Sequence, residues 1–212
     1  MEKKSQIVNV PNMLTLSRIV LIFIFVLLAS ARHLHSFSPE SFRIIKIIAY
    51  SLAFIAGLTD FFDGYIARKY NLVTDFGALM DPLADKIFVT ATMLIMVEVK
   101  LMPAWIAVIV ISREFMVTGL RLIATQHNVI IAADGWGKTK TLLQMIMLGI
   151  AGASWIEIFD LKTAVWFGIK LWPVWNAYMW VIVAVTVFSG FKYFFNNLDL
   201  FRGEAEKEEK RN

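Results

Sequence analysis

The chain has 212 residues, 58% of them hydrophobic, and its mean hydropathy is +0.63. A soluble domain averages about 45 to 50% apolar residues, so the composition excludes an ordinary soluble protein and indicates a polytopic membrane protein with one domain. The absence of cysteine excludes disulfides, iron–sulfur clusters and thiol catalysis, and with a net charge of only +4 we expect no nucleic-acid partner.

The amino-terminal segment, residues 1–12, is polar, and we expect it to lie beside the membrane in the cytoplasm. Pro11-Asn12 offers a turn and an N-cap to a first helix. The apolar run 19–29 is short and is followed by Ala-Ser-Ala, which imitates a signal-peptide cleavage site. Extended back to residue 13, the helix reaches the length needed to span a bilayer. We therefore predict a first transmembrane helix, and cleavage after Ala31 is the alternative.

Five further apolar segments follow the first. We expect them at about residues 44–62, 83–99, 103–121, 141–155 and 172–193. Residues 13–195 would then form one all-α membrane domain with six transmembrane helices, and residues 196–212 a charged, disordered tail.

The basic residues predict the orientation of these helices. If the amino terminus is inside, fifteen of the 21 Lys and Arg residues lie on the inner side or at inner helix ends. The outer six are Arg32, Arg43, Lys46, Lys100, Lys162 and Lys170. Because cytoplasmic loops carry an excess of Lys and Arg, we predict that both termini are cytoplasmic.

Four carboxylates interrupt the apolar pattern where the second segment meets the third. They are Asp60, Asp63, Asp81 and Asp85. Charge at this depth is costly, so such a cluster is a functional-site hypothesis. Spacings of three and four place each pair on one face if both flanks are helical. Two facing pairs would make an all-oxygen site that suits Mg²⁺ or Mn²⁺, and Mg²⁺ commonly bridges carboxylates to substrate phosphates.

Small residues and one cation accompany the acids. Gly64 and Ala67 on the first helix and Gly77 on the second would let backbone or ligand approach closely. Arg68 supplies a planar cation suited to phosphate. Pro82 follows the third acid, and we expect it in the first turn of the third helix.

Four cations gather at the inner ends of the fourth and fifth segments. They are Arg113, Arg121, Lys138 and Lys140. Cations beside apolar segments are costly unless something anionic pairs with them. The residues alone leave two interpretations open, a site for an anionic ligand and a positive-inside surface in contact with lipid headgroups.

These motifs together resemble a known family. The pattern D-x-x-D-G-x-x-A-R, eight residues, G-x-x-x-D-x-x-x-D over residues 60–85 resembles the signature of the CDP-alcohol phosphotransferase family in every fixed position. R-E-F, G-L-R and G-K-x-K-T-x-x-Q over residues 113–144, with Thr15 and Arg18, resemble its phosphatidylglycerophosphate synthase branch. The resemblance covers residues 11–144.

The resemblance implies a reaction and its partners. The phosphatidyl group of CDP-diacylglycerol would pass to sn-glycerol 3-phosphate, with release of CMP, at a site that faces the cytoplasm in the cell inner membrane. The implied partners are these two substrates and the lipid bilayer, and the resemblance allows a homodimer.

The resemblance also implies roles for individual residues. The metal, Mg²⁺ or Mn²⁺, would be held by Asp60, Asp63, Asp81 and Asp85. Asp85 would also be the general base. The cytidine diphosphate group would contact Asp60, Gly64, Ala67, Arg68 and Gly77. The acceptor phosphate would contact Arg113, Arg121, Lys138 and Lys140.

Two other functions fit part of the pattern. A member of the same family could use inositol phosphate, serine or an aminoalcohol as acceptor. A cation transporter could line its pathway with carboxylates, although its acids would be spread across the bilayer rather than gathered at one side. The histidines, His33, His35 and His127, are too scattered to be expected as metal ligands.

Overall fold

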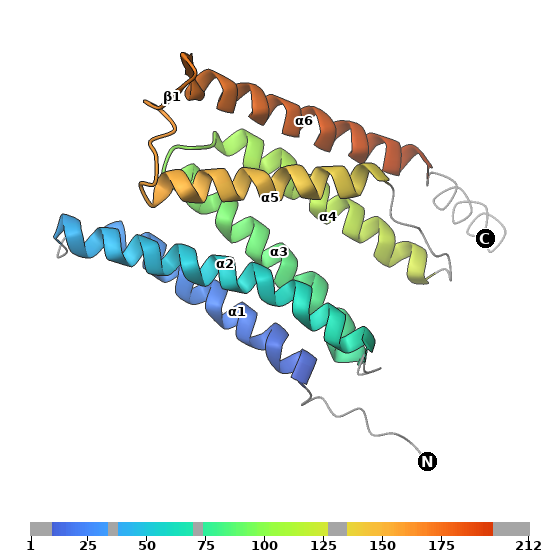
Figure 1. The fold of residues 1–212 in the computed structure, drawn as a ribbon. Coiled ribbons are helices and arrows are strands. Elements are labelled where there is room, and N and C mark those ends of the chain that lie inside the picture. Colours follow the sequence, from blue (N-terminus) through green and yellow to red (C-terminus); the bar gives the residue numbers. More distant parts are fainter. Residues whose placement is uncertain (1–9, 34–37, 70–73, 127–134, 197–212) are drawn as a thin grey trace. The chain divides into compact units, whose positions relative to one another are not determined.

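The computed structural model describes residues 10–33, 38–69, 74–126 and 135–196. Within these ranges the chain is helical apart from short connections and one small hairpin (Figure 1). The elements are α1 Val10–Ala29, η1 Ser30–His33, α2 Pro39–Lys69, α3 Asp75–Glu98, α4 Ala104–Gln126, α5 Gly135–Trp155, β1 Val165–Trp166, β2 Ile169–Lys170 and α6 Leu171–Asn196. The predicted all-α class is confirmed, and the hairpin is an addition to it.

Two of the described helices are long and apolar enough to cross a membrane. They are α1, over Asn12–Ala29, and α6, over Leu171–Asn196. Only 33% of the α1 span and 39% of the α6 span are buried inside the protein. Most of the surface of each helix is therefore available for contact with lipid or solvent.

The helices around the acidic motif are longer than the apolar runs indicate. Thr74 caps α3, and its Oγ1 accepts a hydrogen bond of 3.1 Å from the backbone N–H of Gly77. The helix therefore begins at Asp75, and the prediction that Pro82 lies in its first turn is wrong, since Pro82 lies inside α3. Proline has no N–H to donate to the preceding turn, yet the helix continues past it.

The chain divides into two compact units. The first contains Met1–Leu101 and Gly152–Ile158, and the second contains Met102–Ala151 and Phe159–Asn212. In the first unit, α1 packs against both α2 and α3. The buried face of α1 repeats every three to four residues, as expected for a helix that packs along one side. Its members are Asn12, Thr15, Arg18, Ile22, Phe25 and Ala29. The opposite face exposes Val20, Phe23 and Leu27.

The end of α5 belongs to the first unit and is fixed to α2. A Cβ on Gly152 would lie 2.0 Å from the Tyr50 ring, so only glycine allows this contact. One turn beyond, Glu157 forms an ion pair with the buried Lys46. The hydrogen bond from Lys46 lowers the pKa of the Glu157 carboxyl.

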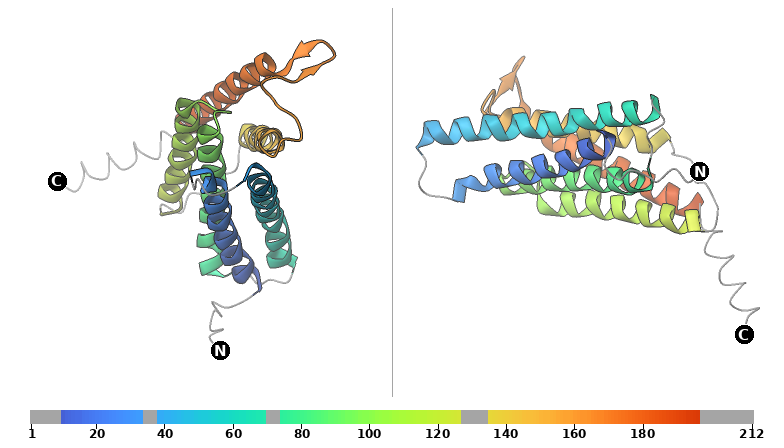
Figure 2. Two further views of the ribbon diagram at one scale, coloured as in Figure 1. Left: turned by 90° about the vertical axis from the view of Figure 1, so that its left-hand side faces the viewer. Right: turned by 90° about the horizontal axis from the view of Figure 1, so that it is seen from below.

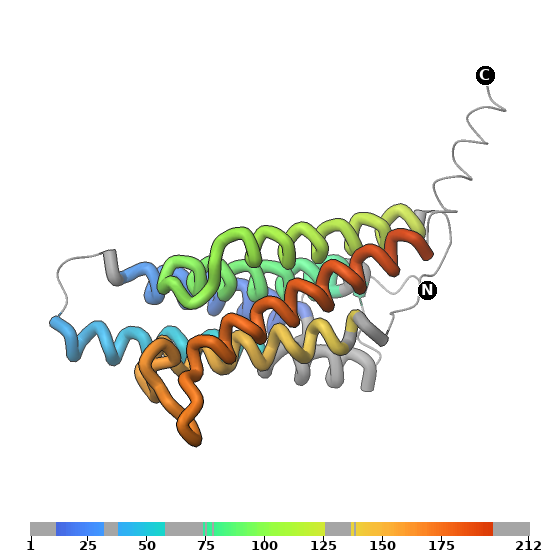
Figure 3. The backbone as a smooth tube through the Cα atoms, turned by 90° about the horizontal axis from the view of Figure 1, so that it is seen from above, coloured from blue at the N-terminus to red at the C-terminus, as the bar shows by residue number. Residues whose placement is uncertain are grey.

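In the second unit, α4 and α6 lie side by side (Figure 3). They run in the same direction. Trp105 at the start of α4 contacts Trp180 in the first half of α6, with ring centroids 5.1 Å apart, and Leu120 packs with Tyr193 towards the ends of both helices. α5 joins α6 through a hydrogen bond of 2.8 Å from the Tyr178 hydroxyl to the Leu143 carbonyl.

Candidate functional site

The four acids all lie on α2 and α3, which pack against each other. Asp60 and Asp63 fall in the last third of α2, where the backbone is helical through Lys69. Because the backbone is helical there, the spacing of three residues places Asp60 and Asp63 on the same face of α2. Their side chains, with those of Gly64, Ala67 and Arg68, lie outside the described residues.

Asp81 is held by a residue from α1. The Thr15 hydroxyl donates a hydrogen bond of 2.6 Å to its Oδ1, and Thr15 is 1% exposed. A hydrogen bond to an ionised acceptor is short and strong, so this contact fixes the orientation of one carboxylate oxygen. Asp85 follows one turn later on α3 and is half-buried. Thr15 and Asp81 are 66 positions apart, and this contact was not predicted from the sequence.

Gly77 lies where α3 packs closely against Asn12 of α1. A Cβ there would stand 2.7 Å from Oδ1 of Asn12, which is itself buried and accepts a hydrogen bond of 3.0 Å from the Thr74 hydroxyl. Gly77 therefore has a packing role. Its predicted contact with the cytidine diphosphate stays a prediction.

Of the four predicted metal ligands, the structure describes the side chains of Asp81 and Asp85 only. Among the described side chains, which exclude those of Asp60 and Asp63, no three His, Cys, Asp or Glu residues gather as a ligand set. The two acids on α3 supply carboxylate oxygens one helical turn apart, which is the donor type that hard divalent cations prefer. The four-carboxylate site stays a prediction.

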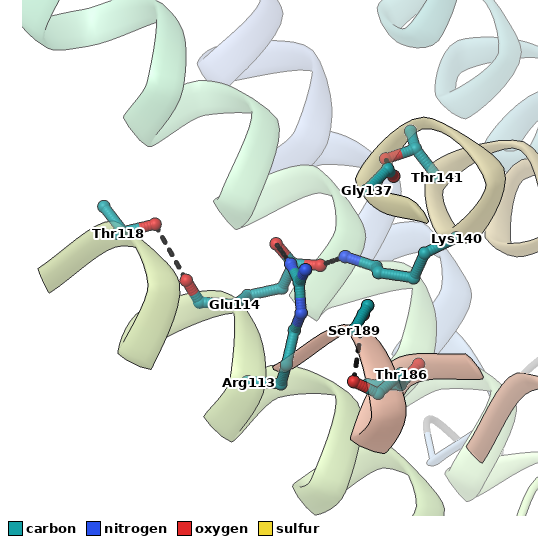
Figure 4. Close-up of polar contacts among 8 residues, drawn as sticks. All are labelled: Arg113, Glu114, Thr118, Gly137, Lys140, Thr141, Thr186 and Ser189. Atoms are coloured by element: carbon teal, nitrogen blue, oxygen red, sulfur yellow. Dashed lines mark hydrogen bonds and ion pairs between the residues drawn. The ribbon is translucent and has the colours of Figure 1, made fainter. Parts of the chain in front are cut away.

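A second polar cluster lies in the other unit, around Glu114 of α4 (Figure 4). Lys140 of α5 is 2% exposed and forms an ion pair with Glu114. Arg113 Nη1 lies 3.9 Å from the other carboxylate oxygen. Two cations thus surround one anion, which leaves a net positive charge in a largely buried region.

Three buried polar atoms beside this cluster have no hydrogen-bond partner within the described residues. They are Nε of Arg113, Nε2 of Gln144 and Oγ1 of Thr186. Ser189, one turn after Thr186 on α6, is also buried and donates to the Thr186 carbonyl at 3.1 Å. An unmade buried hydrogen bond costs about 1 to 3 kcal/mol, so these atoms are suited to a ligand that brings acceptors.

The structure thus joins two of the four predicted phosphate-binding cations, Arg113 and Lys140, through Glu114. Arg121 lies two turns beyond Arg113 with an exposed side chain, and that of Lys138 lies outside the described residues. Thr186 and Ser189 were missed by the sequence analysis. Two hydroxyls three apart inside the apolar run of α6 are the signal that could have found them.

Comparison with known proteins covers nearly the whole chain. The family model for CDP-alcohol phosphatidyltransferase matches residues 8–188. A CDP-diacylglycerol–glycerol-3-phosphate 3-phosphatidyltransferase of Bacillus subtilis is 40% identical over 197 residues, which is 92% of this chain and 97% of that protein. Proteins of the same name from Rickettsia bellii and Haemophilus influenzae are 34% and 41% identical, over 88% and 66% of this chain and 93% and 74% of their own lengths.

Proposed function

Because the chain belongs to the CDP-alcohol phosphatidyltransferase family, we propose that it transfers the phosphatidyl group of CDP-diacylglycerol to sn-glycerol 3-phosphate. The products are phosphatidylglycerophosphate and CMP. The observation that carries this proposal is the position of the family motif, whose four acids fall on two helices that pack against each other. The names of relatives that align over nearly the full chain support the same donor and acceptor.

The proposed setting is the cell inner membrane, crossed by α1 to α6 with both termini in the cytoplasm. The exposed apolar faces of α1 and α6 support it, since side chains such as Leu27 and Phe191, 72% and 59% exposed, would contact lipid there. The excess of basic residues at the inner helix ends supports the orientation. The acids then face the compartment that holds soluble phosphorylated substrates.

We assign the divalent metal, Mg²⁺ or Mn²⁺, to Asp60, Asp63, Asp81 and Asp85. The hydrogen bond from Thr15 fits this role, because it fixes one Asp81 oxygen and leaves the other available. When bound, the metal supplies positive charge beside the donor diphosphate. Gly64, Ala67 and Arg68 follow on the same stretch of α2, and we assign them to the cytidine diphosphate group of the donor.

In the reaction, a glycerol hydroxyl attacks the phosphorus that carries the diacylglycerol, and the bond from that phosphorus to the bridging oxygen breaks. CMP leaves with the bridging oxygen, and the hydroxyl proton passes to Asp85. Such a transfer asks the protein mainly to position the reactants and to neutralise charge.

The Glu114 cluster is the proposed site for the acceptor phosphate. A phosphate group carries only acceptors at neutral pH, and Arg113, Lys140 and Gln144 offer donors to it. The ion pair with Glu114 orients the buried Lys140. An acceptor without phosphate, such as zwitterionic serine or a protonated aminoalcohol, would leave these cations without a phosphate to bind.

An acceptor panel tests the proposal. Purified protein in detergent is given CDP-diacylglycerol with sn-glycerol 3-phosphate, inositol phosphate, serine or an aminoalcohol, and the lipid product is identified by mass spectrometry. We expect phosphatidylglycerophosphate with the first acceptor and little or no product with the others. A preference for any other acceptor would overturn the assignment, and so would the absence of CMP release with all four.

A further inference from the structure

A small hairpin precedes α6 and has no part in the proposed reaction. β1 pairs with β2 in an antiparallel register, Val165 with Lys170 and Trp166 with Ile169. The two turn residues, Phe167 and Gly168, both have positive φ, 47° and 77°. This is the geometry of the tight turns that join two-residue hairpins. β2 continues directly into Leu171, the first residue of α6.

The tip of this hairpin is apolar and exposed. Trp166 is 68% and Ile169 59% exposed, and Phe167, at 89%, is the most exposed large hydrophobic side chain among the described residues. The Trp166 and Phe167 rings lie against each other, with centroids 5.4 Å apart. The hairpin therefore presents an aromatic pair to whatever surrounds it.

The turn itself does not favour phenylalanine at position 167. Positions with positive φ favour Gly, Asn and Asp, and a bulky side chain there is strained. Exposure of the ring to water would be a second cost. Phe167 is thus unfavourable for the turn and for contact with water, and both observations point to an apolar surrounding at the tip.

The connection of the hairpin to α6 indicates that this apolar surrounding is the membrane. α6 is apolar and long enough to cross a membrane, so a hairpin fused to its first residue lies near the membrane–water boundary. Trp172 follows in the first turn of α6, and Lys162 Nζ lies 5.7 Å from its ring centroid. Indoles and lysines are typical of this boundary, where the ring meets lipid and the ammonium meets headgroup phosphates.

The backbone limits how deep the hairpin can lie. A two-stranded hairpin has two unpaired edges, and unpaired backbone N–H and C=O groups are not tolerated in the hydrocarbon core. The strands must therefore stay at the headgroup level. Only the side chains at the tip can reach the acyl chains.

We propose that residues 165–170 form an interfacial anchor, in which Trp166 and Phe167 insert into the bilayer boundary at the amino-terminal end of α6. Figure 2 (left) shows the hairpin extending away from the start of that helix. The anchor fixes the depth of α6 in the membrane. It thereby also fixes the depth of Thr186 and Ser189, which lie on the same helix.

Spin labelling tests the proposal, because the chain has no native cysteine. The full-length variants Ile169→Cys and Thr163→Cys carry a nitroxide in phosphatidylcholine–phosphatidylglycerol nanodiscs. Both positions are exposed, and Thr163 lies outside the hairpin. We expect the label at 169 to collide several-fold more with oxygen, relative to a water-soluble nickel complex, than the label at 163. Equal ratios at the two positions would overturn the proposal.

Two changes at Phe167 separate anchoring from turn formation. With the label at 169, Phe167→Asn suits the positive φ better and removes the ring, while Phe167→Leu keeps an apolar tip. We expect the oxygen preference to fall several-fold in the Asn variant and to persist in the Leu variant, with helical content unchanged in both. An unchanged preference in the Asn variant would contradict the proposal. Broadening that depends on the labelled fraction would instead assign the surface to a second copy of the chain, which would also contradict it.

Discussion

The Thr15 hydroxyl is the clearest contribution of one residue to the acidic site. It comes from a helix that carries none of the four acids, and it holds one oxygen of Asp81 at 2.6 Å. If Asp81 binds metal, a carboxylate free to rotate would present the wrong oxygen for part of the time. Under the proposed metal assignment, the role of Thr15 would be to position that ligand.

We expect Thr15→Val to lower kcat by roughly ten- to a hundredfold, since a hydrogen bond to a charged group contributes about 1.5 to 3 kcal/mol. Valine has nearly the same shape, so the packing of α1 against α3 should persist. Thr15→Ser keeps the hydroxyl and serves as the control, with a kcat within a few-fold of the native value. Native turnover in the Val variant would show that the contact has no positioning role.

Gln144 and Thr186 allow a test that separates binding from stability. Their buried polar atoms have no partner within the described residues. Replacing them with apolar residues of similar size, Gln144→Leu and Thr186→Val, should leave the melting temperature unchanged or higher. Each change should raise the KM for sn-glycerol 3-phosphate about tenfold and leave the KM for CDP-diacylglycerol nearly unchanged.

Thr141→Val is the matched control for these two variants. Thr141 is an exposed hydroxyl on the same helix as Gln144 and bonds the Gly137 carbonyl at 3.1 Å. Both KM values should stay within twofold of native. If Gln144→Leu and Thr186→Val lower the melting temperature and leave both KM values unchanged, the two side chains serve the fold alone.

At the scale of elements, two helices are followed within two residues by a residue with positive φ that is not glycine. Lys100, φ 58°, follows the Val99 cap of α3, and the Leu101 N–H donates to the Met96 carbonyl at 2.9 Å. Glu157, φ 66°, lies two residues beyond the end of α5, and the Ile158 N–H donates a matching hydrogen bond to the Ala153 carbonyl at 3.1 Å. Both ends have the pattern that glycine usually completes. Glu157 has a compensating contact, the ion pair with Lys46, and the described residues give Lys100 no such ion pair.

Replacing each of these residues with glycine should therefore have opposite effects. Lys100→Gly relieves a backbone cost of about 1 kcal/mol and should raise the melting temperature in detergent, whereas Lys100→Ala should not. Glu157→Gly relieves the same strain but leaves the buried Lys46 without its carboxylate, which is the larger loss, so the melting temperature should fall. Equal stabilisation by both glycine variants would show that the ion pair contributes nothing.

The sequence predicted helices well and their limits poorly. Apolar runs identify a helix, but its ends depend on capping residues. Thr74 caps α3, so the helix begins at Asp75, well before Pro82. The hairpin at 165–170 was missed because its strands have two residues each and its turn contains phenylalanine rather than the Asn-Gly typical of such turns. Turn propensities predict a turn only where the residue suits the local backbone conformation. Phenylalanine does not suit the positive φ of position 167.

The candidate site was predictable where it rests on spacing within one helix. The four acids are an example, because their positions on α2 and α3 follow from the pattern alone. Contacts between distant segments were not predictable. Thr15 with Asp81 and Lys140 with Glu114 depend on how helices pack. A single sequence carries no signal for such pairs.

At the scale of the whole molecule, the six-helix topology has a direct test. Single cysteines at Ser36 and Lys162 should react with a membrane-impermeant thiol reagent in intact cells, and cysteines at Asn71 and Lys207 should react only after lysis. The native chain contributes no background, since it has no cysteine. Labelling of Asn71→Cys in intact cells would place the acids on the wrong side of the membrane for soluble substrates. A mature protein that begins after Ala31 would show that α1 is a cleaved signal.

The central claim is that carboxylate-bound metal supports transfer of a phosphatidyl group to sn-glycerol 3-phosphate. The most direct measurement follows CMP and phosphatidylglycerophosphate together, by chromatography and mass spectrometry, from purified protein with both substrates. We predict equal amounts of the two products with Mg²⁺ or Mn²⁺ and none in excess EDTA. Asp63→Asn and Asp81→Asn, folded by circular dichroism, should be nearly inactive with metal present. Full turnover in excess EDTA, or native activity in either variant, would contradict the account.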